Sequence, residues 1–223
     1  MTITENVKKI KSELGPGVHL VAATKMNDAA RIREAIAAGV EICGENRVQE
    51  LLEKLEQNAY EGSRLHFIGH LQKNKAKYIV GKVELIQSVD TLELIDVIGA
   101  LASRRGIVQD ILLEINIAAE PSKSGFAPDD IYAALDHADK VSGVHVRGLM
   151  SVPPICSESV QNRPYFERLK QLFIDISTKK YDNNSMDFLS AGMSGDYLEA
   201  VECGSNMVRI GSAIFGPRDY SKH

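Results

Sequence analysis

The sequence predicts a single (β/α)8 barrel over residues 1–223, with one extra N-terminal helix. Short apolar segments typical of buried strands alternate with amphipathic helical segments along the chain, and there are eight of these strands, the number that closes such a barrel. No stretch rich in Pro, Gly or Ser divides the chain. An open doubly wound sheet is the alternative, but the turn after the first strand, residues 24–27, has no glycine.

The first expected element is a helix at residues 3–14, because its apolar residues recur at helical spacing and so share one face. Those residues are Ile3, Val7, Ile10 and Leu14. Eight predicted strands follow, at residues 18–24, 41–44, 65–69, 85–89, 109–117, 144–150, 187–190 and 207–215.

Capping residues mark the limits of the helices between these strands. We expect Asn27 to begin the helix after the first strand and Gly39 to end it, while Thr91 begins a later one. Pro128 and Pro164 suit the first turns of two further helices, where a missing amide hydrogen is harmless. Each predicted helix has one apolar stripe, as a helix packed outside a barrel requires.

The composition narrows the class of protein. Of the 223 residues, 44% are hydrophobic and 25% charged, and the net charge of −4 argues against a nucleic-acid surface. No apolar run is long enough to span a bilayer and no signal-peptide core is present, so we expect a cytoplasmic protein that does not bind membranes. The cysteines Cys43, Cys156 and Cys203 lack metal-ligand spacing, and we expect neither a metal site nor a disulfide framework.

Lys25 is the first candidate site residue. Polar residues at the C-terminal ends of barrel strands point into one shared mouth, where such folds carry their chemistry. Lys25 ends the first strand, directly after the apolar residues 21–23. A lysine there either reaches out to solvent or is desolvated, and a desolvated amine is a nucleophile suited to Schiff-base formation.

The last predicted strand supplies the second candidate group. Gly211 and Ser212 offer backbone amides and a hydroxyl to an anion, and Arg209 lies within an apolar run. A buried arginine needs a partner, either a carboxylate such as Glu202 or the ring nitrogen of a cofactor. An amine at Lys25, a phosphate site at the last strand and an arginine between them suggest bound pyridoxal phosphate.

Other polar residues at strand ends have two interpretations. Ser194 and Asp196 precede a short helix and are expected either to cap it or, in the case of Ser194, to help bind an anion. Asn46 likewise either caps the helix after the second strand or belongs to the site. Three further residues could be site residues or solvated loop residues: His70, Asn116 and Lys123.

Six segments, in order, resemble the pyridoxal phosphate homeostasis protein family: residues 21–26, 44–50, 66–75, 148–150, 192–196 and 208–216. The resemblance implies a barrel related to the N-terminal domain of alanine racemase, with Lys25 as the aldimine lysine for pyridoxal 5'-phosphate. It also implies a role in supplying or buffering this cofactor and in amino-acid balance. The full set of cofactor-binding residues then expected is Lys25, Asn46, Met193, Ser194, Arg209, Gly211 and Ser212.

This sequence differs from that of alanine racemase in several features. Its C-terminal β-domain and its tyrosine base have no counterpart in this sequence, and Lys123 stands where the racemase has an arginine. Ala191 replaces a methionine common in the homeostasis family, a change expected to be silent. We therefore expect a monomeric, non-enzymatic carrier that delivers the cofactor to pyridoxal phosphate-dependent apoenzymes. The alternatives are a small racemase or decarboxylase of amino acids, and a barrel that binds phosphate without covalent chemistry.

Overall fold

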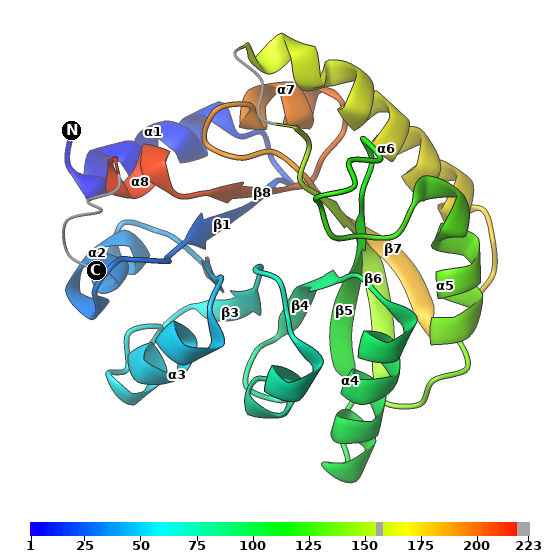
Figure 1. Cartoon of the computed structure of the whole chain (residues 1–223). Helices are drawn as coiled ribbons and strands as arrows, with labels where there is room; N and C mark the ends of the chain where they lie inside the picture. The colour runs from blue at the N-terminus through cyan, green and yellow to red at the C-terminus, as the bar shows by residue number, and fades with distance from the viewer. Residues whose placement is uncertain (155–157, 218–223) are drawn as a thin grey trace.

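The computed structural model describes residues 1–154 and 158–217, and within them parallel strands form a closed barrel in the order β1 to β8. The predicted (β/α)8 fold with its N-terminal helix is confirmed, and Figure 1 shows the helices arranged around the outside of the strands. The strands are β1 His19–Ala23, β2 Ile42–Glu45, β3 Arg64–Phe67, β4 Leu85–Val89, β5 Gln109–Ile115, β6 Val144–Ser151, β7 Asn184–Ser190 and β8 Met207–Ile210.

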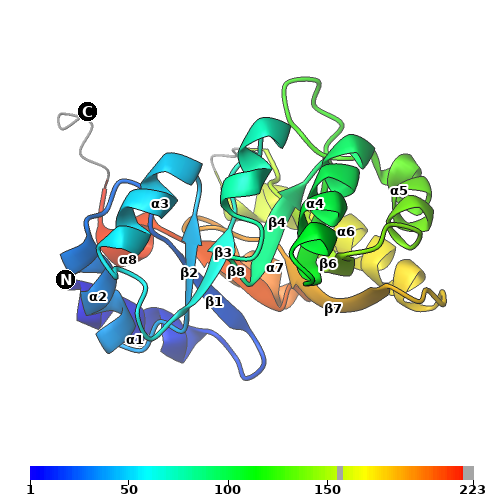
Figure 2. The same cartoon turned by 90° about the horizontal axis from the view of Figure 1, so that it is seen from below.

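The helices begin where the local sequence satisfies their first amides. The α-helices are α1 Ile3–Glu13, α2 Ala29–Ala37, α3 Val48–Glu56, α4 Leu92–Arg104, α5 Ile131–Ala138, α6 Arg163–Ser177, α7 Tyr197–Glu202 and α8 Ser212–Phe215, and the 3-10 helices are η1 Lys73–Tyr78, η2 Pro128–Asp130 and η3 Ser159–Asn162. Thr91 caps α4 by accepting a hydrogen bond from the Leu94 amide at 3.3 Å. Pro164 lies in the first turn of α6. Figure 2, turned by 90°, shows helices such as α3 and α4 beside the strands of the barrel.

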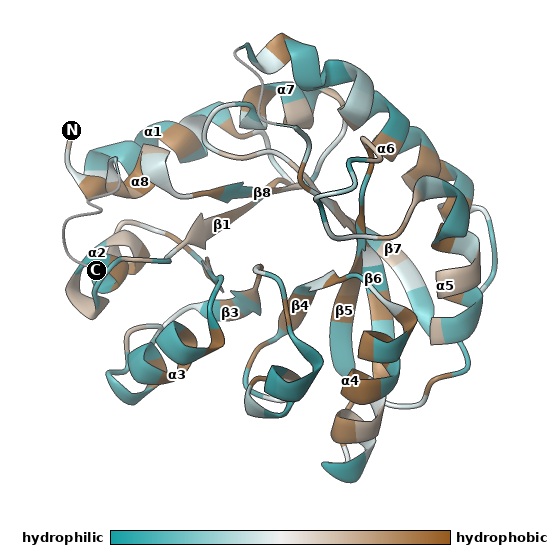
Figure 3. Ribbon diagram, viewed as in Figure 1, coloured by the Kyte–Doolittle hydropathy of each residue, from teal (hydrophilic) through white to brown (hydrophobic). Residues whose placement is uncertain are grey.

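Apolar side chains pack in two clusters, one inside the barrel and one between the strands and the helices. Figure 3 shows hydrophobic and hydrophilic residues alternating along the helices, and the apolar ones form the buried stripes, such as Leu94, Ile95 and Ile98 in the helix Leu92–Arg104. Each fully buried aliphatic or aromatic side chain contributes roughly 1.5–3 kcal/mol. The interior cluster consists of Val21, Ile42, Ile68, Leu85, Leu112, Met150 and Met207.

Pairing of the first strand with the last closes the barrel and brings the candidate residues together. Val21 of β1 lies opposite Arg209 of β8, so Lys25 and the residues after Ile210 leave the barrel at the same end. The helix before β1 and the helix after β8 also meet: α1 and α8 lie side by side in Figure 1. Asn6 of α1 donates its side-chain amide to the carbonyl oxygen of Ile214 in α8 at 2.9 Å. The end of the barrel that carries Lys25 is called the mouth below.

Several predicted boundaries differ from the structure, and two of them concern the elements next to the mouth. The expected strand at residues 207–215 is β8 followed by the short helix α8, because the backbone turns at Gly211 (φ −115°, ψ −77°) and the amides of Ile214 and Phe215 then donate to its carbonyl oxygen. A buried apolar run of this length fits a strand or a helical turn equally well. Helix α2 begins at Ala29, and Asp28, rather than Asn27, caps it by accepting from the Arg31 amide.

The described residues contain no helix long and apolar enough to cross a membrane, and no cluster of His, Cys, Asp or Glu that could hold a metal ion. Cys43 is buried and Cys203 partly exposed, and both are free thiols. Cys156 lies outside the described residues. Ala191, expected to be a silent packing change, is fully buried in the outer core.

Candidate functional site in the barrel mouth

Lys25 follows β1 at the mouth and is partly buried. The residue before it, Thr24, is fully buried, and the residue after it, Met26, has a left-handed backbone with φ 61°. A methionine rarely adopts this conformation without support, because its Cβ is then crowded by the backbone. The turn that carries Lys25 is therefore held by its surroundings, and the residues that hold it are on β2 and α3.

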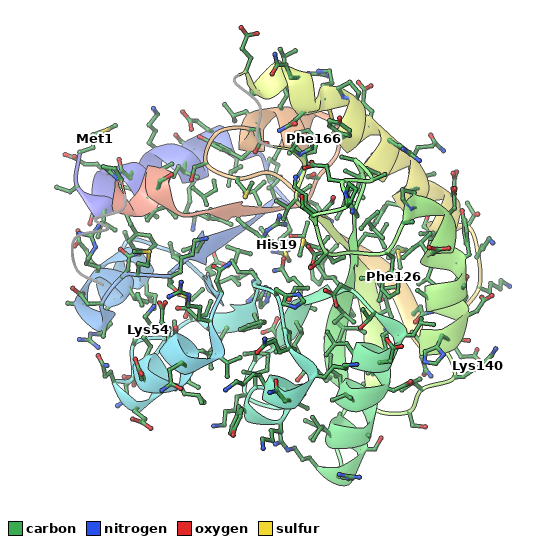
Figure 4. The ribbon with its side chains drawn as sticks, viewed as in Figure 1. Met1, His19, Lys54, Phe126, Lys140 and Phe166 are labelled. Carbon is green, nitrogen blue, oxygen red and sulfur yellow. The ribbon has the colours of Figure 1, made fainter. Side chains whose placement is uncertain are left out.

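A buried ion-pair network, here called the lysine-turn clamp, lies behind this turn. It consists of Glu45, Glu50, Lys54 and Tyr60. The Lys54 ammonium donates to Glu45 Oε2 at 2.7 Å, to Glu50 Oε2 at 3.1 Å and to the carbonyl oxygen of Thr24 at 2.9 Å. Lys54 comes from α3 (Figure 4), and Glu45 is fully buried at the end of β2.

The clamp holds both neighbours of Lys25. Thr24 donates its hydroxyl to Glu45 Oε2 at 2.9 Å, and the Met26 amide donates to Glu50 Oε2 at 2.9 Å. Burial alone would raise the pKa of Glu50, but the hydrogen bonds from Met26 and Lys54 lower it, so it remains ionised. Burial and the charge of Glu45 raise the pKa of Tyr60, which donates to Glu45 as a neutral phenol at 3.0 Å.

Asn46 lies beside this network and does not cap α3, whose N-cap residue is Arg47. Its amide N–H donates to Glu45 Oε1 at 2.9 Å, and its backbone passes so close to Gly69 that a Cβ there would lie 2.1 Å from the Asn46 carbonyl oxygen. The side-chain oxygen Oδ1 is buried and accepts no hydrogen bond from the described residues. A buried acceptor of this kind is expensive without a donor.

Arg209 is 5% exposed and faces the barrel axis from β8. Its Nη1 donates to Ser190 Oγ at 2.6 Å and its Nη2 to the carbonyl oxygen of Ser151 at 2.9 Å. Burial lowers its pKa to about 10, opposed by the charges of Glu114 and Asp196, and the guanidinium is still charged at neutral pH. Glu202, the carboxylate expected as a structural partner, instead binds Arg163 at 2.5 Å.

Ser194, Gly211 and Ser212 meet after β7 and β8. The Ser194 hydroxyl oxygen accepts from the amides of Gly211 at 3.2 Å and Ala213 at 3.3 Å, so it links the two loops and does not cap α7. Gly211 faces β1: a Cβ there would lie 3.4 Å from Ala23, two residues before Lys25. The N-cap residue of α7 is Asp196.

The loop after β7, which contains Met193 and Ser194, is fixed by Asp196. Its Oδ1 accepts from the Met193 amide at 2.7 Å and its Oδ2 from Asn162 Nδ2 at 2.8 Å. Asp196 is 9% exposed, so these charge-assisted bonds are shielded from water. Met193 is thereby held near the mouth through its backbone.

Glu114 is a mouth residue that the sequence analysis did not single out. Burial, together with the charge of Asp90, raises the pKa of Glu114 to about 7, against the opposing effects of Arg209 and His70. A glutamate near the C-terminal end of β5, directly after three apolar residues, was a sequence signal that could have found it. His70 itself is largely exposed and lies 3.1 Å from Asp90.

Asn116 and Lys123 serve the loop after β5. Asn116 Nδ2 donates to the carbonyl oxygens of Glu120 at 2.8 Å and Lys123 at 3.2 Å, which folds the loop back on itself. The Lys123 ammonium binds Glu120 Oε1 at 2.8 Å and the Val152 carbonyl oxygen at 3.4 Å. These contacts give both residues a structural role.

The fold and the mouth together define a class of protein: a (β/α)8 barrel with an amine at the end of its first strand and amide and hydroxyl groups after its seventh and eighth. The family model for the N-terminal domain of alanine racemase matches residues 1–219. The pyridoxal phosphate homeostasis protein of Aquifex aeolicus is 38% identical over 98% of this chain and 96% of that relative. The one from Pseudomonas aeruginosa is 34% identical, over 98% and 97%.

The chain belongs to the alanine racemase N-terminal domain family, and within it to the pyridoxal phosphate homeostasis proteins. Among solved structures, PipY of Synechococcus elongatus with pyridoxal phosphate bound is 31% identical, with a TM-score of 0.87 over 96% of this chain and 100% of PipY. An alanine racemase of Clostridium difficile, 12% identical, shares the fold alone: its TM-score is 0.76, over 99% of this chain and 57% of the racemase.

Proposed function

We propose that this protein binds pyridoxal 5'-phosphate in the barrel mouth, attached to Lys25, and holds the cofactor for intracellular supply. The observation that carries the proposal is the pairing of β1 with β8, which brings the turn of Lys25 beside Gly211 and Ser194. Relatives that share a third of this sequence carry the name of this cofactor, and PipY binds it in a barrel of the same fold.

The mouth residues fit the groups of this cofactor. Asn46 Oδ1 is a buried acceptor open to a donor, and Gly211 lets the backbone come close to an anion. The proposed roles are phosphate binding for Ser194, Gly211 and Ser212, contact with the ring for Asn46 and Met193, and contact with the pyridine nitrogen for Arg209.

When bound, the cofactor supplies an aldehyde, which condenses with a primary amine and releases one water molecule. The clamp fixes Thr24 and Met26, and so determines where the Lys25 amine can reach. Arg209 is a donor only and keeps its proton, so a pyridine nitrogen facing it stays unprotonated. An unprotonated ring withdraws electrons weakly, which disfavours the carbanion chemistry that racemases and decarboxylases need.

We therefore propose a carrier with little catalytic power, acting as a monomer that delivers the cofactor to apoenzymes. A weak proton transfer is the second candidate, favoured by Glu114, whose pKa of about 7 would let it exchange protons at neutral pH. Racemisation of alanine decides between them. Turnover near 10 per second, an ordinary enzyme rate, would refute the carrier role.

The test of cofactor binding is a titration of the apo-protein with pyridoxal 5'-phosphate, followed by borohydride reduction and peptide mapping. The wild type should develop a yellow absorption band, and the reduced pyridoxyl group should map to Lys25. Lys25→Ala should lose the band, whereas the control Lys123→Ala should retain it. A label found mainly on Lys123 or Lys73 would show that Lys25 is the wrong residue.

A further inference from the structure

A line of buried polar side chains runs from Arg209 at the mouth toward the opposite end of the barrel. Ser190, Gln87 and His66 are each 0–1% exposed. Ser190 Oγ lies 2.7 Å from Gln87 Oε1, and Gln87 Nε2 lies 2.9 Å from His66 Nδ1. Such polar groups inside an otherwise apolar barrel are costly unless every bond between them is made.

The direction of these hydrogen bonds follows from Arg209. A guanidinium only donates, so Ser190 Oγ accepts from it at 2.6 Å and gives its own proton to Gln87 Oε1. The amide nitrogen of Gln87 then faces His66 Nδ1, and also donates to Met207 Sδ at 3.2 Å. If the Gln87 amide were flipped, its oxygen would face the Met207 sulfur, which has no proton to donate. The thioether therefore favours the orientation with the amide nitrogen toward Met207 and His66.

The last member, His66, is thereby fixed in one tautomer. Its Nδ1 accepts a hydrogen bond, so its single proton is on Nε2, which has no hydrogen-bond partner among the described residues and lies 3.8 Å from Glu84 Oε1. Burial lowers the pKa of His66, opposed by Glu84 and reinforced by Arg64 and His19, which keeps the ring neutral. Glu84 is 46% exposed, so the line ends at solvent.

We propose that Ser190, Gln87 and His66 are positioning residues that fix the guanidinium of Arg209 in the mouth. The proposal rests on the proposed function in that Arg209 is expected to face the pyridine nitrogen. Arg209 donates one hydrogen bond to the carbonyl oxygen of Ser151 and another to Ser190, the first member of this set of three side chains, which is called the relay below. If the relay fails, Ser190 can turn away and the guanidinium loses the hydrogen bond that its Nη1 donates to Ser190 Oγ.

The first test needs no cofactor. Nitrogen-15 NMR of the imidazole ring in the apo-protein at pH 7 should show His66 neutral, with its proton on Nε2. A proton on Nδ1, or a doubly protonated ring, would contradict the bond directions. Side-chain signals of Arg209 should be observable in the wild type, because hydrogen bonds slow its proton exchange.

The second test compares two buried glutamines of equal size. Gln87→Met removes the middle of the relay, whereas Gln109→Met removes hydrogen bonds to backbone groups of residues 81, 83, 84 and 110 and none to Ser190, Gln87 or Arg209. We expect Gln87→Met alone to broaden the Arg209 signals, displace the absorption band of bound pyridoxal phosphate and weaken its binding about tenfold. Equal effects of the two substitutions would show that Gln87 acts only by packing and does not position Arg209.

Gln87→Glu provides a rescue. Its carboxylate still accepts from Ser190 and can accept from a protonated His66 Nδ1, so the Arg209 signals should return while His66 changes its protonation state. Loss of the Arg209 signals in this folded variant would refute the relay. If the wild type fails to attach the cofactor at Lys25, the proposed function falls, but the apo-protein spectra still decide whether the relay positions Arg209.

Discussion

The ammonium group of Lys54 lies 2.9 Å from the carbonyl oxygen of Thr24, the residue immediately before Lys25. The same ammonium neutralises Glu45, which is fully buried, and Glu50, which holds the Met26 amide. One charge on α3 therefore fixes the backbone on both sides of the candidate cofactor lysine.

Lys54→Met should destabilise the protein by about 3–5 kcal/mol, because it leaves the Glu45 carboxylate buried without its cation. Chemical denaturation measures this difference. Lys11→Met is the matched control, since Lys11 pairs with Glu41 at the surface and its loss should cost less than about 1 kcal/mol. The double variant Lys54→Met/Glu45→Gln should recover part of the loss, and additive effects of the two changes would contradict a direct pairing.

Glu114→Gln should change how stability depends on pH. The pKa of Glu114 is about 7 in the folded protein and near its ordinary value of 4.5 in the unfolded chain. The folded state thus holds the proton more tightly between these values, so wild-type stability falls as pH rises through this window, by at most about 3 kcal/mol. The variant should lose most of this slope. Parallel curves for the two proteins between pH 4.5 and 7.5 would show that Glu114 ionises normally.

The fold class could be predicted from sequence because strand and helix alternation is a local pattern, and the fold class then implies that β1 pairs with β8. Lys25 and Ser194 are candidates for the same reason, because both follow strands at the mouth of the predicted barrel. The lysine-turn clamp was not, because Glu45 at a strand end and Lys54 on a helix are ordinary polar residues until packing buries them together. Burial of a charge is a property of the assembled barrel and leaves no periodic signal.

The phosphate should supply much of the non-covalent affinity for the cofactor. Charge-assisted hydrogen bonds contribute roughly 1.5–3 kcal/mol each. Replacing pyridoxal phosphate by pyridoxal removes two or three of them, which should cost at least about 4 kcal/mol, or about a thousandfold in Kd. Ser212→Ala should cost less, about tenfold, because backbone donors survive. Titration of the apo-protein with both compounds measures this, and equal affinities would refute a phosphate site at Ser212.

Gly69→Ala should be strongly destabilising, although the residue contacts no expected ligand. Its Cβ would lie 2.1 Å from the Asn46 carbonyl oxygen, and backbone cannot move aside cheaply, so a loss of at least about 3 kcal/mol is expected. Gly15→Ala is the control, because nothing lies within 4 Å of a Cβ there and its effect should stay within about 0.5 kcal/mol. Denaturation midpoints that agree for the two variants would contradict this close approach.

The pairing of β1 with β8 has a consequence for the order of events during synthesis. Lys25 and Gly211 are distant in sequence, and they meet only when the barrel closes. Contacts of such long separation form late, since the intervening chain must first be ordered. A nascent or half-folded chain would thus expose Lys25 without Gly211 beside it, and acquisition of the cofactor would report that folding is complete.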